Sequence, residues 1–277
     1  MMMRLVVLLV LLWAAPSWAA ITFDAVEDSP DNETSATTSW SHTVGAGSDR
    51  FLTVCIQSRG PSSEIANLPV SSLTYGGVAL TRLKFHQYDD ASTVFRVEQW
   101  GLVAPTVGAA TVAVRFTGIP SEFGVGTSLS FFGVNQSITV DADAGASVTC
   151  TTLSASITTV AANAWIVDCA VGRNDSGLTV GSGQTARTDR VVGVSEGTND
   201  GVGVSTVNGK ATPGVEVMDW TQASSTNWAQ SAIALAPSGG SDPAPSSPST
   251  ATVRWTNGID AVGVTSAILR RCLGPAC

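Results

Sequence analysis

Short segments in which apolar and polar residues alternate recur along this chain, and turn residues separate them. In residues 111–117, Val112, Val114 and Phe116 share one face, and polar or small side chains share the other. Successive side chains of a strand point to opposite faces, so this pattern predicts a strand with one buried face. No segment keeps a 3.6-residue period, and a parallel sheet would need such helices as crossovers. We therefore expect an all-β fold, a jelly-roll-like antiparallel β-sandwich.

The stretch from Trp40 to Gln57 holds two such segments around a Gly/Ser/Asp cluster, which predicts an antiparallel strand pair joined by a loop. Between residues 52 and 57 the even-numbered side chains are apolar and are assigned to the core. The odd-numbered ones share the other face, and its polar members, Thr53 and Gln57, are assigned to the outside. The stretch is therefore interpreted as a core-forming strand pair rather than a functional site.

Gly76-Gly77 separates residues 70–75 from residues 78–85. Glycines tolerate the positive φ angles of a tight turn, so the pair predicts a second hairpin. Later strands are expected at 147–156, 164–171, 185–195, 201–207, 215–220 and 228–236.

Residues 1–19 have the composition of a secretory signal peptide. Arg4 precedes an apolar run from Leu5 to Leu12, and Ala19 supplies a small residue at the cleavage position. The run is shorter than the roughly 20 residues that span a bilayer. We expect a secreted or cell-surface protein whose mature chain has no membrane span.

The rest of the chain is expected to divide into three parts. Residues 20–237 contain the strand pattern and are assigned to the β-sandwich domain, and residues 238–250 are rich in Pro, Ser and Gly and are assigned to a linker. Residues 251–277 form a short C-terminal tail, too short to bury a core of its own.

Acidic residues outnumber basic ones by 22 to 14, which gives a net charge of −8. A surface of this sign repels nucleic acids and anionic membranes, so neither is an expected partner.

The five cysteines are an odd number for a compartment that favours disulfides. Cys272 and Cys277 enclose a turn-forming tetrapeptide, and Cys150 and Cys169 lie on successive expected strands, so each pair is a disulfide candidate. Cys55 lies in an apolar strand and is expected to be a buried free thiol. Connectivity stays open, because sequence alone does not fix it.

Several segments resemble a family of exported bacterial jelly-roll sandwich domains. They are the opening stretch, T-Y-G-G-V-A-L-T at 74–81, L-V-A-P at 102–105 with G-A-A-T-V at 108–112, F-F-G-V-N-Q at 131–136 and A-W-I-V-D-C at 164–169. The resemblance covers residues 21–237 and implies a secreted or surface protein with a sandwich of the concanavalin or carbohydrate-binding-module type. It implies no catalytic residues, because the matching motifs are turns and core faces.

Two carboxylates lie near tryptophans on expected strands, Glu98 with Trp100 and Glu216 with Trp220. Such pairs could stack against and hydrogen-bond a sugar ring, or they could be outward charges beside core tryptophans. Glycoside hydrolysis would need two carboxylates facing each other at about 5 to 9.5 Å. Six tryptophans follow the signal peptide, and several on one exposed face would form a sugar-binding platform: Trp40, Trp100, Trp165, Trp220, Trp228 and Trp255.

Asp141-Ala142-Asp143 has the appearance of a fragment of a calcium-binding loop, and Asp28 with Asp31 forms a second acidic cluster. Hard cations take several closely spaced oxygen ligands, so a structural Ca²⁺ is one hypothesis. Solvated turn residues are the other.

The sequence Gly193-Val194-Ser195-Glu196-Gly197 matches the G-x-S-x-G pattern of serine hydrolases. That motif works at a strand-to-helix turn beside a histidine, whereas another turn follows here. We therefore assign no catalytic residue.

The leading hypothesis is an exported, non-catalytic binding or adhesion module, with polysaccharide or cell-surface glycan as its ligand. The alternatives are a carbohydrate-active lyase or hydrolase on the same sandwich, and a structural component of a surface layer or filament.

Overall fold

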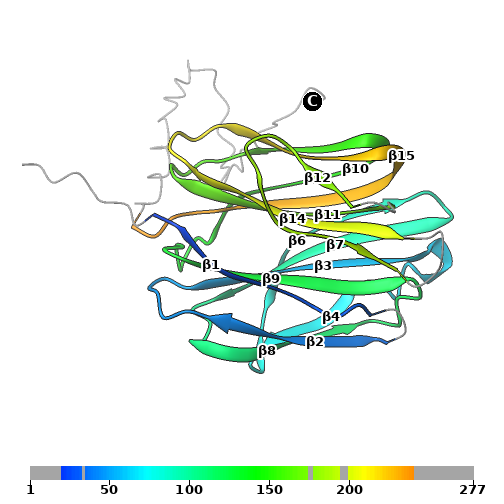
Figure 1. Ribbon diagram of the computed structural model, residues 1–277. Coiled ribbons are helices and arrows are strands. Elements are labelled where there is room, and N and C mark those ends of the chain that lie inside the picture. The colour runs from blue at the N-terminus through cyan, green and yellow to red at the C-terminus, as the bar shows by residue number, and fades with distance from the viewer. Residues whose placement is uncertain (1–19, 33–34, 174–176, 194–198, 240–277) are drawn as a thin grey trace, which may run out of the picture. The chain divides into compact units, whose positions relative to one another are not determined.

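The described part of the chain consists almost entirely of antiparallel strands, as the computed structural model shows (Figure 1). The described residues are 20–32, 35–173, 177–193 and 199–239. Within them fifteen strands and one 3-10 turn, η1 (Ser62–Glu64), are present, which confirms the expected all-β sandwich. No helix there is long and apolar enough to cross a membrane. The expected signal peptide at 1–19 and tail at 251–277 lie outside these residues, as do residues 240–250 of the expected linker.

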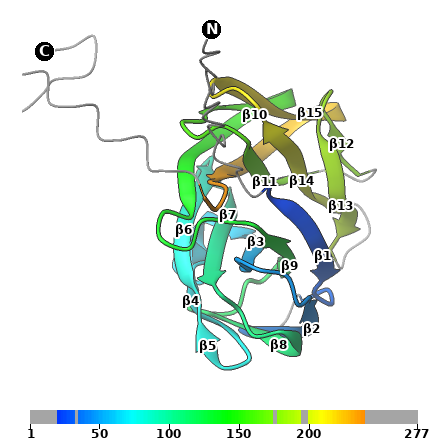
Figure 2. The ribbon, with the colours of Figure 1, turned by 90° about the vertical axis from the view of Figure 1, so that its left-hand side faces the viewer.

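The strands of this part form three sheets, which we call the middle sheet, the β2 sheet and the β15 sheet. Figures 1 and 2 show the middle sheet between the other two. In spatial order the middle sheet holds β1 (Thr22–Asp28), β9 (Phe123–Phe132), β3 (Phe51–Pro61), β7 (Thr93–Val103) and β6 (Thr81–Asp89). The β2 sheet holds β2 (Thr37–Val44), β8 (Gly108–Phe116), β4 (Val70–Tyr75) and β5 (Val78–Ala79). The β15 sheet holds β10 (Val140–Thr158), β15 (Val215–Leu235), β11 (Ala164–Arg173), β14 (Asp200–Lys210) and β13 (Thr185–Val192), with β12 (Thr179–Val180) paired to β15.

β3 lies at the centre of the middle sheet and is buried from Phe51 to Gly60. Its even-numbered apolar residues, such as Val54, join the core between the middle sheet and the β2 sheet. Phe51 and Cys55 join the other core, between the middle sheet and the β15 sheet. The expected outward face of β3 is therefore wrong, because a second sheet covers it.

The expected strand pair across Trp40 to Gln57 is also wrong. β2 pairs with β8, whereas β3 pairs with β7 and β9, so the two strands belong to different sheets. The loop between them carries the chain from one layer to the next. It passes so close to the Phe132 ring that a Cβ atom at Gly47 would overlap it. Two alternating segments around a loop do not show whether they pair with each other or with strands elsewhere.

The hairpin at Gly76-Gly77 is confirmed, since both residues have positive φ (55° and 84°) and β4 pairs with β5 across them. Its second strand ends after two residues, and the chain continues as β6 in the middle sheet. The alternation in residues 111–117 is also confirmed, because Val112, Val114 and Phe116 are buried in β8.

The hairpin of β10 and β15 bends back over the β15 sheet. Cys150 is paired with Thr226 and Thr152 with Thr221, so the ladder is interrupted between these two pairs. Beyond the interruption, Leu153 and Trp220 pack against Ala170 of β11 and form a further small core. The two strands expected at 215–220 and 228–236 are thus one bent strand.

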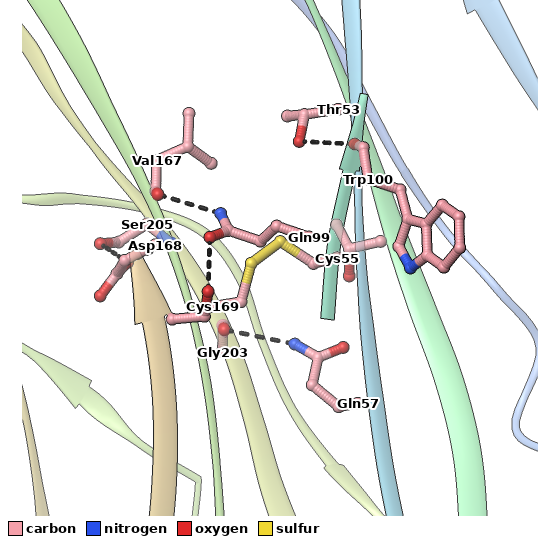
Figure 3. The surroundings of a disulfide bond; sticks show 12 residues. Thr53, Cys55, Gln57, Gln99, Trp100, Val167, Asp168, Cys169, Gly203 and Ser205 are labelled. Atoms are coloured by element: carbon pink, nitrogen blue, oxygen red, sulfur yellow. Dashed lines mark hydrogen bonds between the residues drawn. A yellow bond between two sulfur atoms is a disulfide. The ribbon is translucent and has the colours of Figure 1, made fainter. Parts of the chain in front are cut away.

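A disulfide between Cys55 of β3 and Cys169 of β11 joins the middle sheet to the β15 sheet, with Cα atoms 6.1 Å apart (Figure 3). This corrects the free thiol expected at Cys55 and the candidate pairing of Cys150 with Cys169. Among the described residues Cys150 has no disulfide partner. It does not reach Cys169, because β15 lies between β10 and β11 and Cys169 faces the middle sheet. Cys272 and Cys277 lie outside the described residues.

Replacing both disulfide cysteines, Cys55→Ala with Cys169→Ala, is expected to lower the free energy of unfolding by roughly 4 kcal/mol. The bond closes a loop with a sequence separation of 114, and opening it restores conformational entropy to the unfolded chain. Urea unfolding under non-reducing conditions measures the change. Cys150→Ala is the control and should leave the midpoint unchanged; equal midpoints for all three proteins would contradict the prediction.

Candidate functional site

The described tryptophans do not form a platform. Trp40, Trp165, Trp220 and Trp228 are buried, and Trp100 alone among them is partly exposed. Any contribution of a tryptophan to binding from this part of the chain therefore comes from Trp100 on β7.

An arginine side chain on β6 stacks on two aromatic rings at this position. The guanidinium of Arg82 lies 5.0 Å from the ring centroid of Phe85 and 6.0 Å from that of Trp100. The Phe85 ring also contacts the guanidinium of Arg96, at 4.4 Å. We call Arg82, Phe85, Arg96 and Trp100, with Glu98 beneath them, the Arg82 surface.

A β-bulge brings Arg82 and Phe85 together. They are three residues apart, and in a regular strand such residues point to opposite faces. The register of β6 against β7 shifts between Arg82 and Lys84, which returns Phe85 to the face that Arg82 and Trp100 share. The Phe85 side chain is 45% exposed and that of Arg82 is 41% exposed, so the stack is open to solvent.

Glu98 holds this stack from below and is only 1% exposed. One of its carboxylate oxygens accepts hydrogen bonds from Arg96 Nε (2.6 Å) and the backbone N–H of Val70 (3.1 Å). The other accepts from Trp100 Nε1 at 3.0 Å and lies 3.7 Å from Arg82 Nη1. Of the two alternatives for Glu98, the structure favours neither a sugar contact nor an outward charge: it is a buried group that orients its neighbours.

Glu216 and Trp220, the second carboxylate–tryptophan pair, contact different partners. Trp220 is fully buried and donates from Nε1 to Asp168, at 2.7 Å. Glu216 forms an ion pair with Lys210 at 2.7 Å. These residues belong to the β15 sheet, whereas Glu98 and Trp100 belong to the middle sheet, so the four do not form one site.

Three of the four aspartates considered as calcium ligands link the edges of neighbouring sheets. Asp28 accepts a hydrogen bond from Thr188 of β13 at 2.7 Å, and Asp31 lies 3.3 Å from Arg190 of the same strand. Asp143 of β10 forms an ion pair with Lys84 of β6.

The fourth, Asp141, accepts hydrogen bonds from the backbone N–H groups of Val160 (2.6 Å) and Ala161 (2.8 Å) and so fixes a turn. In the described part of the chain no three His, Cys, Asp or Glu side chains are grouped to hold a metal ion. The calcium hypothesis stays a prediction, and the four aspartates have the protein contacts given above.

A buried serine–histidine chain, which the sequence did not indicate, joins β1, β2 and β9. The ring nitrogens of His42 lie 2.9 Å from Ser128 Oγ and 3.0 Å from Ser130 Oγ, and Ser130 donates to Asp24 at 2.7 Å. His42 and both serines are fully buried, so no substrate reaches them. Burial lowers the pKa of His42 to about 4, against the opposing attraction of Asp24. Residues 194–197 of the G-x-S-x-G motif lie outside the described residues.

A second buried polar cluster holds the bent hairpin in place. Asp168 of β11 accepts hydrogen bonds from Trp220 (2.7 Å), Gln230 (2.7 Å) and the hydroxyl and backbone N–H of Ser205. Burial raises the pKa of Asp168 to about 6, while these hydrogen bonds oppose the shift. Four donors around one carboxylate satisfy its acceptor sites, which indicates a structural role.

The chain matches no protein-family model, no curated protein and no solved structure. The resemblance to exported jelly-roll domains stays a prediction, and the function has to be inferred from the geometry.

The wild type is expected to lose about 3 kcal/mol of stability, relative to a His42→Gln variant, as the pH falls from 6.5 to 4. The unfolded chain takes up a proton at the ordinary histidine pKa of 6.5, whereas folded His42 does so only near pH 4. Stability is therefore lost through this window and levels off below it. Urea unfolding of both proteins at several pH values measures the difference, and a constant difference would contradict the prediction.

Proposed function

We propose that this chain is an exported, non-catalytic module that binds polysaccharide or cell-surface glycan through the Arg82 surface. The observation that carries the proposal is the exposed stack of Arg82 with Phe85 and Trp100. Export rests on the signal-like composition of residues 1–19.

The Arg82 surface combines the two kinds of contact that sugars need. Sugar rings present C–H groups that pack on aromatic side chains, and their hydroxyls need hydrogen-bond partners placed nearby. Phe85 and Trp100 offer the aromatic carbon, and Arg82 offers N–H donors. Among the described residues the guanidinium of Arg82 makes no hydrogen bond, and its nearest carboxylate is Glu98 at 3.7 Å. Its donors are therefore open to a ligand.

Binding is favoured over hydrolysis by the state of the carboxylates. Glu98 is buried and shared among three donors, and Glu216 is paired with Lys210 in another sheet. A glycosidase needs an acid and a base that both reach the scissile bond. Neither of these two residues is available for that role.

Phe85→Ala is expected to weaken glycan binding at least tenfold, about 1.4 kcal/mol, because it removes both an apolar contact and one support of Arg82. Ile119→Ala is the matched control, since Ile119 is exposed to a similar degree, 50%, in a different part of the chain. A glycan array identifies the ligand for the wild type, and titration calorimetry compares the variants.

The array is run with and without EDTA, and chelation is expected to leave binding unchanged. Absence of any bound glycan, or equal affinities for wild type and Phe85→Ala, would refute the proposed function. Loss of binding in EDTA would instead indicate a metal-dependent site elsewhere in the chain.

A further inference from the structure

We infer that the glycan bound at the Arg82 surface carries carboxylate groups, as polyuronates do. The inference rests on the proposed glycan-binding function and adds the chemical class of the ligand. Three features of the described residues support it: local charge, a pre-oriented guanidinium and an open depression beside it.

Positive charge gathers at this surface in a protein that is acidic as a whole. The Arg82 surface holds Arg82 from β6 and Arg96 from β7, and Lys84 lies next to it on the other face of β6. Along the whole chain, by contrast, acidic residues outnumber basic ones by 22 to 14. Two carboxylates, Glu98 and Asp143, oppose these three cations. A small positive excess therefore remains where an anionic ligand would bind, and the acidic remainder of the chain repels that ligand from other positions.

Arg82 is held ready for a planar anion. Stacking on Phe85 and Trp100 restricts its side chain, and Trp100 is itself fixed by its hydrogen bond to Glu98. A guanidinium presents parallel N–H donors that match the two oxygens of a carboxylate. Since the side chain is already ordered, less conformational entropy is lost when the ligand binds.

An open depression of about 380 Å³ lies beside the stack, lined by Arg82, Leu83, Lys84, Phe85 and Asp143. The depression thus places the Arg82 guanidinium, the Phe85 ring and the ion pair of Lys84 with Asp143 around one space. A sugar ring seated there would contact Phe85 and direct its carboxylate to Arg82.

The experiment compares polygalacturonate with its methyl ester, which has the same backbone without the charge, by titration calorimetry with the full mature chain. We expect the charged polymer to bind at least tenfold more tightly at low ionic strength, and added salt to reduce the difference. Arg82→Ala should remove this preference, and Arg82→Lys should restore only part of it, because lysine keeps the charge without the planar fork.

Arg115→Ala is the matched control. Arg115 is an exposed arginine that lines a depression of similar size, about 370 Å³, on the outer face of the β2 sheet. This variant should bind polygalacturonate as the wild type does. Circular dichroism and urea unfolding verify that each variant folds.

Equal binding of polymer and ester, unaffected by Arg82→Ala, would overturn the inference while leaving glycan binding intact. Binding of neither polymer, with no other glycan bound on the array, would overturn the proposed function as well. Tighter binding of a sulfated glycan or of a single-stranded oligonucleotide would also overturn the assignment of a carboxylate ligand.

Discussion

Because other sheets cover both faces of β3, each polar side chain on this strand has to find its partner inside the protein. Thr53 donates to the carbonyl of Trp100 at 3.1 Å, Cys55 is bonded to Cys169, and Gln57 donates to the carbonyl of Gly203 at 3.5 Å (Figure 3). The last two contacts cross from the middle sheet to the β15 sheet. Polar residues in this strand thus join the layers instead of facing water.

The neighbouring strand continues this polar interface. Gln99 of β7 donates to the carbonyl of Val167 at 3.1 Å (Figure 3). It also accepts a hydrogen bond from the hydroxyl of Ser231 at 2.8 Å. Hydrogen bonds are directional, so each of these bonds fixes the position of one sheet on the other. Apolar contacts alone do not fix it, because they have no preferred direction. The disulfide lies among these bonds and adds a covalent link to the same interface.

Strand positions could be predicted from the sequence, since alternation in residues such as 111–117 and the glycine pair at 76–77 depends on local geometry. The packing of one sheet on another could not be predicted. A polar strand face has the same sequence pattern whether water or a buried partner forms its hydrogen bonds, as Cys55 and Gln57 show. The disulfide joins residues 114 positions apart, and no local pattern carries that information. Trp100 and Glu98 were identified as candidates by their spacing. Arg82 and Phe85 were missed, because the bulge that places them on the same face is invisible in an alternation pattern.

Several aspartates lie at the edges of the sheets, where they contact the edge strand of a neighbouring sheet. An uncovered sheet edge invites pairing with another chain, so proteins protect edges with charged or bulky side chains. Here β6 and β10 are linked by Lys84 with Asp143, and β1 and β13 by contacts such as Thr188 with Asp28. Carboxylates that resemble metal ligands in sequence therefore serve to join two edges.

The Arg82 surface lies on the edge strand of the middle sheet, where cover by the β2 sheet is incomplete. Toward the centre of that sheet, side chains facing the β2 sheet, such as Val54, are fully buried. On β6 the same face carries Phe85, which is 45% exposed. A side chain placed there keeps a rigid sheet beneath it and still reaches solvent, which is the condition that a pre-organised binding surface needs. A pre-organised surface also needs side chains held in one orientation, and the buried Glu98 provides this. A buried carboxylate has to be paired, and the hydrogen bonds that pair Glu98 fix the positions of Arg96 and Trp100.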